Sequence, residues 1–251
     1  MTPRQLAQRA RTALRDAGDE RIQRRQRSFF KPWEKIELYG ISTPGVRHIE
    51  RELYGLIRKI WSYADVVEFS ELLMQDRYIE AKSLSLMLLA RYHRQFDEAL
   101  LGRAKKWLRC DLCNNWAVTD QLSTQIISRI LDGHAALAPV VAAWHRSPNL
   151  WVRRASAVSF VKPAGKARHL EHVYAVVTAL LPDGHDLIHK ACGWVLREAG
   201  KSNPARLEAY LLAHGPAIPR TALRYAIERF PERQRHMILE RTRDKHEVEC
   251  R

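Results

Sequence analysis

The chain contains 251 residues, enough for one sizeable domain or one continuous array of small repeats without support from disulfides or metals. Apolar residues make up 46% of it, but no uncharged run approaches the roughly 20 residues that a membrane-spanning helix requires. The 42 lysines and arginines exceed the 28 acidic residues and give a formal net charge of +14. This excess favours a polyanionic partner, and arginine's planar guanidinium favours a nucleic acid, because it suits phosphate; a solvated basic surface without a partner is the alternative.

The N-terminal segment carries arginines throughout. Residues 1–27 contain no apolar stretch of the kind found in secretory signals, so we expect a cytoplasmic location. Residues 1 to about 40 are predicted to form a separate helical cap whose first helix is strongly basic.

Helical periodicity dominates the chain that follows. In Tyr78–Tyr92, for example, apolar residues recur at intervals of three and four. No sustained alternation of apolar and polar residues marks a strand. The pairs Asp132-Gly133 and Asp183-Gly184 each follow a helical stretch and indicate breaks between helices. The predicted fold class is therefore all-α.

Four segments resemble one another, since each starts at a turn and continues into a helix with a small residue near its start. The segments align on Thr119, Ala155, Ala191 and Ala222, which lie 36, 36 and 31 residues apart. Solenoid repeats built from helix hairpins have similar lengths, ~33 to 47 residues, and their inner helices line one concave surface. We therefore predict a curved α-solenoid with a basic concave face. Residues 41–230 would form the repeats and residues 231–251 a charged helix or tail, all within one domain spanning residues 1–251.

The four cysteines, Cys110, Cys113, Cys192 and Cys250, are too few and too scattered for a disulfide framework. Cys110 and Cys113 have the spacing of half a zinc site or of a redox pair, but no second pair or local histidine pair completes four ligands. We expect reduced cysteines that pack between helices, and neither a metal nor a cofactor.

The repeat alignment brings Trp116, Asp120, Arg154 and Trp194 to nearly equivalent places in successive repeats, and hence onto one predicted surface. Aromatic faces hold cationic or π-rich ligands, arginine binds phosphate, and a carboxylate stabilises developing positive charge. Each residue also has a purely structural interpretation. The tryptophans can pack in the core, Asp120 can interact with the helix dipole, and Arg154 can be solvated or paired with a neighbour.

Two blocks, Asn149–Ala155 and Lys190–Pro204, resemble the AlkD-type DNA alkylation-repair glycosylases, a family of HEAT-like repeat enzymes. The similarity extends from about Tyr39 to Ile227. It implies that Trp116 and Trp194 match the family's two active-site tryptophans and that Asp120 matches its catalytic aspartate.

The same resemblance places Arg154 against the DNA at the lesion, and we expect further DNA contacts from Arg153, Lys190 and Arg197. Two departures stand out. Asn115-Trp116-Ala117 replaces a Trp-Trp-Asp sequence of family members, and their N-terminal DNA-contacting tyrosine has only Phe29 or Phe30 as its nearest counterpart.

The activity that the resemblance implies is hydrolysis of the N-glycosidic bond of purines alkylated at N3 or N7, by a monofunctional glycosylase that does not extrude the base. Such a base is already positively charged, so no strong general acid is required. The carboxylate of Asp120 would stabilise an oxocarbenium-like sugar and orient water. The expected partner is double-stranded DNA that contains such purines, bound by a monomer.

Two other interpretations remain open from the sequence. One is a non-catalytic repeat protein of the same fold that binds damaged or branched DNA. The other is a helical scaffold whose basic face binds an acidic protein or RNA.

Overall fold

The computed structural model describes residues 1–32, 34 and 36–243. Across these residues it is helical, and the only extended pairing there is an isolated bridge between Glu37 and Tyr78. The predicted all-α class is confirmed. Contacts group the chain into two compact units, Met1–Gly133 (unit 1) and His134–Arg251 (unit 2), so the break follows the Asp132-Gly133 pair. The single-domain organisation stays a prediction.

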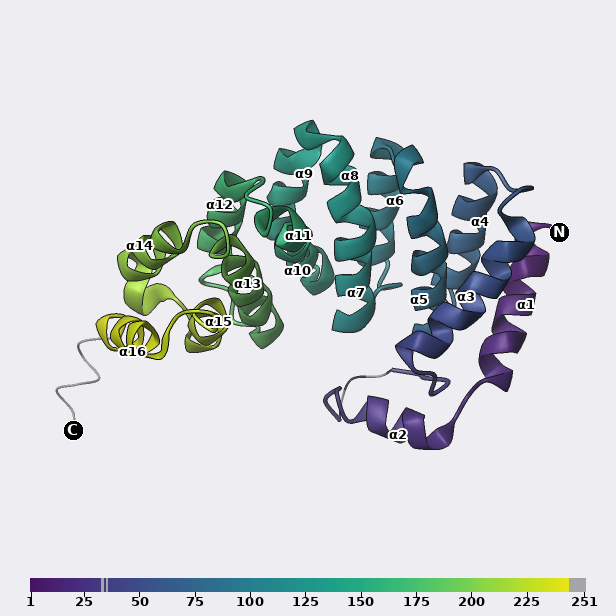
Figure 1. The fold of residues 1–251 in the computed structure, drawn as a ribbon, viewed down its shortest axis with the longest axis horizontal. Helices are drawn as coiled ribbons and strands as arrows, with labels where there is room; N and C mark the ends of the chain where they lie inside the picture. The colour runs from purple at the N-terminus through teal and green to yellow at the C-terminus, as the bar shows by residue number, and fades with distance from the viewer. Residues whose placement is uncertain (33, 35, 244–251) are drawn as a thin grey trace. The chain divides into compact units, whose positions relative to one another are not determined.

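The described residues of unit 1 form eight α-helices and two other helical turns, which follow one another in chain order (Figure 1). They are α1 (Pro3–Asp16), α2 (Glu20–Arg27), α3 (Thr43–Ile57), α4 (Tyr63–Met74), α5 (Ile79–Leu89), η1 (Ala90–Gln95), α6 (Glu98–Arg109), α7 (Trp116–Leu122), η2 (Ser123–Ile127) and α8 (Ser128–Gly133). The basic helix α1 packs against α3 and α4, and Leu6, Ala10 and Leu14 on its apolar face are fully buried. α1 is thus part of the packed core of unit 1.

Helix α2 differs from α1 because none of its residues is buried. Side-chain amides attach it to residues 38–41: Gln23 and Gln26 donate from Nε2 to the carbonyls of Leu38 and Ile41 at 2.6 and 2.7 Å. The buried carboxylate of Glu80 in α5 in turn accepts three backbone N–H groups of residues 39–41, at 2.9 to 3.2 Å. Hydrogen bonds, rather than the burial of apolar side chains, attach α2 to the rest of unit 1.

Unit 2 contains the remaining helices. They are η3 (Ala135–Leu137), α9 (Ala138–Ala142), η4 (Ala143–Arg146), α10 (Leu150–Val158), α11 (Val161–Ala164), α12 (Leu170–Leu180), α13 (Asp186–Ala199), α14 (Pro204–His214), η5 (Gly215–Ala217), α15 (Arg220–Ala226) and α16 (Glu232–Arg241). α10 packs on α13, and α13 packs on α15. The predicted charged C-terminal segment begins as α16, and residues 244–251 lie outside the described part of the chain.

The four small residues used to align the repeats fall in α7, α10, α13 and α15, and all four are fully buried: Thr119, Ala155, Ala191 and Ala222. Gly193 has a related role in α13. A Cβ atom there would lie 2.5 Å from the carbonyl oxygen of Ala222 and 2.5 Å from Cβ of Tyr225. The absence of a side chain at Gly193 therefore lets α15 approach α13 closely.

Within the described ranges, no single helix is long and apolar enough to cross a membrane. The pair Trp116–Gly133 and Ala135–Arg146 passes such a test jointly, by length and composition only. Buried core helices pass the same test, so it is weak support for a span.

The described cysteines divide by exposure. Cys113 and Cys192 are buried, as expected for packing residues, and burial raises the pKa of each thiol to about 12. Cys110 is exposed beside the end of α6, so the packing interpretation is wrong for it. Cys250 lies outside the described residues.

Candidate functional site

Trp116 is the first residue of α7, and the residues before it fix where the helix begins. The buried side chain of Asn115 caps the helix by accepting the backbone N–H of Val118 at 3.0 Å. The hydroxyl of Thr119 donates to the carbonyl of Cys113 at 2.8 Å. These two hydrogen bonds fix the backbone on either side of Trp116, so this residue has little conformational freedom at the start of α7.

Asp120 follows Trp116 by four residues on α7, and both residues are partly exposed. Residues four apart on a helix are neighbours on one face, with Cβ atoms ~5–6 Å apart. The structure therefore brings together the predicted aromatic and acidic groups of unit 1.

A π-helical turn, η2, comes directly after α7. The N–H of Ser128 donates to the carbonyl of Ser123, five residues back. Two hydroxyls bond back into α7: Ser123 donates to the carbonyl of Thr119 and Thr124 to that of Asp120, both at 2.7 Å. Single π-turns inside α-helices are frequent at functional sites.

Helix α5 supports both ends of α7. Lys82 is only 6% exposed and donates from Nζ to the carbonyl of Leu112 at 2.6 Å, just before α7 begins. Burial lowers the pKa of Lys82. Ser83 and Gln121 form a reciprocal pair, with hydrogen bonds of 2.7 and 2.9 Å, near the end of α7.

A cavity of about 430 Å³ lies beside Trp116, and we call it the Trp116 cavity. Its lining comes from α2 and the residues after it, the segment before α3, and helices α3, α5, α7 and η2: Gln26, Phe29, Phe30, Leu38, Ile41, Thr43, Val46, Arg47, Ile79, Glu80, Ser83, Met87, Trp116, Ala117, Gln121 and Gln125. The ring of Phe30 stacks on the indole of Trp116, with centroids 5.1 Å apart and planes 26° apart. An aromatic residue that follows α2 therefore contacts the predicted site.

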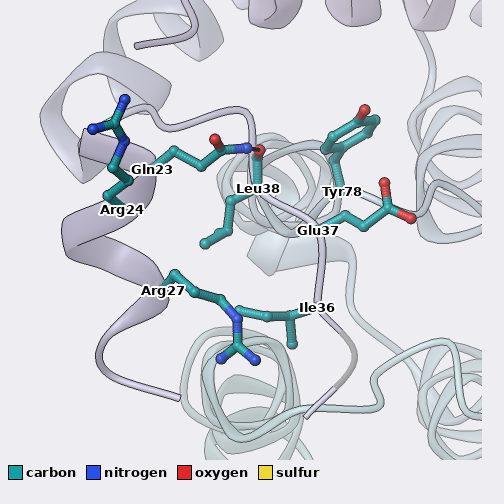
Figure 2. Close-up of a pocket in the computed structure, with 7 residues that line it drawn as sticks. All are labelled: Gln23, Arg24, Arg27, Ile36, Glu37, Leu38 and Tyr78. Carbon is teal, nitrogen blue, oxygen red and sulfur yellow. Dashed lines mark hydrogen bonds between the residues drawn. The ribbon is translucent and has the colours of Figure 1, made fainter. Parts of the chain in front are cut away.

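Figure 2 shows a second cavity of about 410 Å³, between α2 and residues 36–38, with Tyr78 at its edge. The two arginines that line it are already engaged. Arg27 donates to the carbonyls of Lys31, Pro32 and Glu34 at 2.9 to 3.0 Å, and Arg24 pairs with Glu20 at 3.1 Å. This cavity offers fewer uncommitted groups than the Trp116 cavity.

In unit 2, three of the predicted residues share one face of α13. Lys190, Trp194 and Arg197 follow one another at intervals of four and three, and each is partly exposed. Lys190 pairs with Asp186 one turn earlier, at 2.7 Å.

The arginines of unit 2 that were predicted to contact DNA bind other parts of the protein. Arg153 pairs with Asp183 at 2.7 Å and donates to the carbonyls of Ser147 and Pro148. Arg154 is only 5% exposed, and its guanidinium donates to the carbonyl of Leu187.

Arg197 behaves in the same way. Its guanidinium pairs with Glu228, and its Nε lies 3.6 Å from the carboxylate of Glu198. The partners Asp183, Leu187 and Glu228 lie 30, 33 and 31 residues beyond the arginines that bind them, which is about one repeat. Arg153, Arg154 and Arg197 thus connect consecutive repeats, and their expected contacts with DNA stay predictions.

The predicted site residues fall into two groups. Trp116 and Asp120 are together in unit 1, whereas Arg153, Arg154 and the α13 residues are in unit 2. A joint surface formed by both groups stays a prediction. Across the described residues, no group of three or more His, Cys, Asp or Glu side chains is placed to hold a metal ion.

Several residues of the Trp116 cavity were not predicted from the sequence, among them Gln26, Arg47 and Gln125. They have no common spacing, because they come from separate helices. In the sequence, the feature that could have indicated this cavity is the aromatic pair Phe29-Phe30 within an arginine-rich segment.

Comparison with known proteins supports the expected fold and family. A solved structure named "Predicted DNA alkylation repair enzyme from Enterococcus faecalis" is similar to this chain, with a TM-score of 0.73 and 16% sequence identity. The match covers 86% of this chain and 97% of that one, and at this identity it shows the fold. No curated protein sequence matches the chain. A family model described as DNA alkylation repair enzyme matches residues 10–230, so the chain belongs to this family, whose role is DNA alkylation repair and whose partner is DNA.

Proposed function

We propose that the protein is a monofunctional DNA glycosylase that starts base excision repair by hydrolysing the N-glycosidic bond of purines alkylated at N3 or N7. One observation carries the proposal: Trp116 and Asp120 lie one turn apart on the same face of α7, both partly exposed. Membership of the DNA alkylation repair family supports alkylated DNA as the substrate of that pair.

The chemistry follows from charge. A purine alkylated at N3 or N7 is cationic and therefore a good leaving group, so the protein need not protonate it. As the glycosidic bond breaks, positive charge develops on the sugar, and the carboxylate of Asp120 stabilises it and orients the attacking water. The leaving base carries away the bonding electron pair and becomes neutral. Water adds to C1′ and releases one proton to the solvent.

The indole of Trp116 contributes an electron-rich face, which attracts a cationic lesion. We assign the same role to Trp194 on α13. The lesion is then recognised from the side of the deoxyribose and phosphates, within double-stranded DNA. We expect a monomer and a cytoplasmic location.

The test measures free 7-methylguanine released from methylated duplex DNA under single-turnover conditions. The wild-type protein should release the base and leave an uncut abasic strand. Asp120→Asn should lower the rate by roughly 100-fold or more, as expected when one stabilising group is lost from a polar active site. DNA affinity should stay equal or rise, because a negative charge near phosphates is removed.

Asp16→Asn is the matched control, because it removes an exposed carboxylate at the end of α1. Equal release rates for wild type and Asp120→Asn would show that Asp120 is misassigned. Salt-sensitive DNA binding without any release by the wild type would identify a non-catalytic DNA-binding protein instead.

A further inference from the structure

We propose that the Trp116 cavity binds one unpaired nucleotide of DNA. This proposal depends on DNA as the partner, but not on glycosylase activity, since the proposed bond cleavage requires no occupant in the cavity. Three independent features of the lining point to a nucleotide: its aromatic rings, its uncommitted amides and the free guanidinium of Arg47.

The aromatic rings form the first feature. Phe30 and Trp116 are stacked on one another, and Phe29 beside them is 65% exposed. Three rings from two separate segments therefore border one cavity. Proteins bind single-stranded nucleic acid by stacking bases on such rings, whatever the base.

Uncommitted amides form the second feature. The side-chain oxygen of Gln26 is buried and has no hydrogen-bond partner among the described residues, since only its Nε2 is used, on the carbonyl of Ile41. A buried acceptor without a donor is unfavourable, so a ligand that supplies an N–H group fits here. The amide of Gln125 forms no hydrogen bond within the described ranges and adds a donor and an acceptor. A paired base has already used the complementary groups on its Watson–Crick edge, whereas an unpaired base presents them.

Charge is the third feature. Among the described residues, those that line the cavity and carry a charge are Glu80 and Arg47. The carboxylate of Glu80 is satisfied by three backbone N–H groups, so it offers little to a ligand. Arg47 is exposed on α3 and forms no ion pair with any described residue. A free guanidinium at the edge of an aromatic cavity suits the phosphate of the nucleotide whose base enters it.

Size agrees with this occupant. At about 430 Å³ the cavity lies within the ~300–1,000 Å³ range of small-ligand sites. A base stacked inside a regular duplex cannot reach such a site, so the occupant must be unpaired.

The experiment compares two DNA duplexes that differ by one nucleotide, a central single-base bulge of 2-aminopurine and the fully paired equivalent. Fluorescence anisotropy at one fixed salt concentration measures both affinities. The wild-type protein should prefer the bulged duplex by about tenfold, the value that one base–aromatic stack supports. The 2-aminopurine fluorescence should be quenched on binding, because the base stacks on the rings.

Phe30→Ala should reduce the preference to less than about twofold, and Phe30→Tyr, which keeps the ring, should retain it. Arg47→Ala should weaken binding of the bulged duplex more than of the paired duplex. Its matched control is Arg51→Ala, an exposed arginine one turn further along α3 that does not line the cavity. Circular dichroism melting curves confirm that each variant is folded.

Equal wild-type affinities for the two duplexes would overturn the proposal, as would a preference that survives Phe30→Ala. Release of 7-methylguanine by the wild type is measured separately. If the wild type releases 7-methylguanine but shows no preference for the bulged duplex, only the nucleotide site is refuted. If it prefers the bulged duplex but releases no base, only the glycosylase is refuted.

Discussion

The region around α7 and the region around α10 and α13 both carry residues expected to act on DNA, but they use them differently. In the first, Trp116 and Asp120 are partly exposed, and the cavity beside Trp116 is lined by aromatic rings, glutamines and the exposed Arg47. In the second, Arg153, Arg154 and Arg197 are bonded to acceptors about one repeat further along the chain. We therefore expect a basic residue in a repeat helix to bind DNA only where the next repeat offers it no acceptor.

The largest expected effect that tests this comparison comes from Arg154→Ala. The side chain of Arg154 is buried and donates to the carbonyl of Leu187, so its truncation removes that hydrogen bond and leaves a cavity behind. We expect the free energy of unfolding to fall by about 3 kcal/mol, measured by urea denaturation. Arg51→Ala should leave it nearly unchanged. A loss of DNA affinity at unchanged stability would instead make Arg154 a DNA ligand and break the comparison.

An intermediate effect separates paired from free arginines. Arg153→Ala should lower the melting temperature by a few degrees, because it removes a partly buried ion pair and two hydrogen bonds to carbonyls. It should not alter the slope of log affinity against log salt concentration for the bulged duplex. Arg47→Ala should behave in the opposite way and reduce that slope by about one, the change expected for one lost phosphate contact. Identical slopes for both variants would contradict the distinction.

The smallest effect concerns thiols and pH. It sharpens the comparison because, among the described residues, unit 1 has the buried Cys113 and unit 2 the buried Cys192. In a Cys250→Ser background, Cys110 should react rapidly with a thiol reagent, whereas Cys113 and Cys192 should react only when their unit opens. Mass spectrometry of the labelled peptides then shows which unit opens first. Rapid labelling of all three native thiols would contradict the burial.

The pH dependence follows from the same two thiols. Their pKa rises from an ordinary value of 9.0 to about 12 in the folded protein. A raised pKa in the folded state means that this contribution to stability is complete below pH 9 and is lost as the pH rises toward 12. Urea denaturation should therefore show a decline above about pH 9, and Cys113→Ala should reduce its steepness.

Much of the fold could be predicted from the sequence, because each repeat carries the same packing requirement. A small residue that must be buried where two helices meet recurs once per repeat, as at Ala155 and Ala191, and so leaves a periodic trace. The pair Trp116 and Asp120 was also predictable, since a spacing of four places two residues on one helical face.

The partners of the arginines were not predictable in the same way. Arg154 binds a backbone carbonyl, and every residue has one, so no residue type marks the acceptor. The Trp116 cavity escaped prediction for a different reason. It exists because residues 26–30 lie against α7, a contact between segments far apart in the sequence that depends on the hydrogen bonds of Gln26 and Glu80.

The π-turn η2 limits how the length of the helical stretch from α7 to α8 can change. Each residue of an α-helix turns the chain by about 100°, so one residue more or less between two points rotates everything beyond it by that angle. η2 lies between Asp120 on one side and the buried side chains of Ile130 and Leu131 on the other. It therefore sets the rotation, about the helix axis, between the face that carries Trp116 and Asp120 and the buried face of α8. Deleting one residue within Ser123–Ile127 would leave every side chain chemically intact, yet it would turn Asp120 and Trp116 away from their present direction.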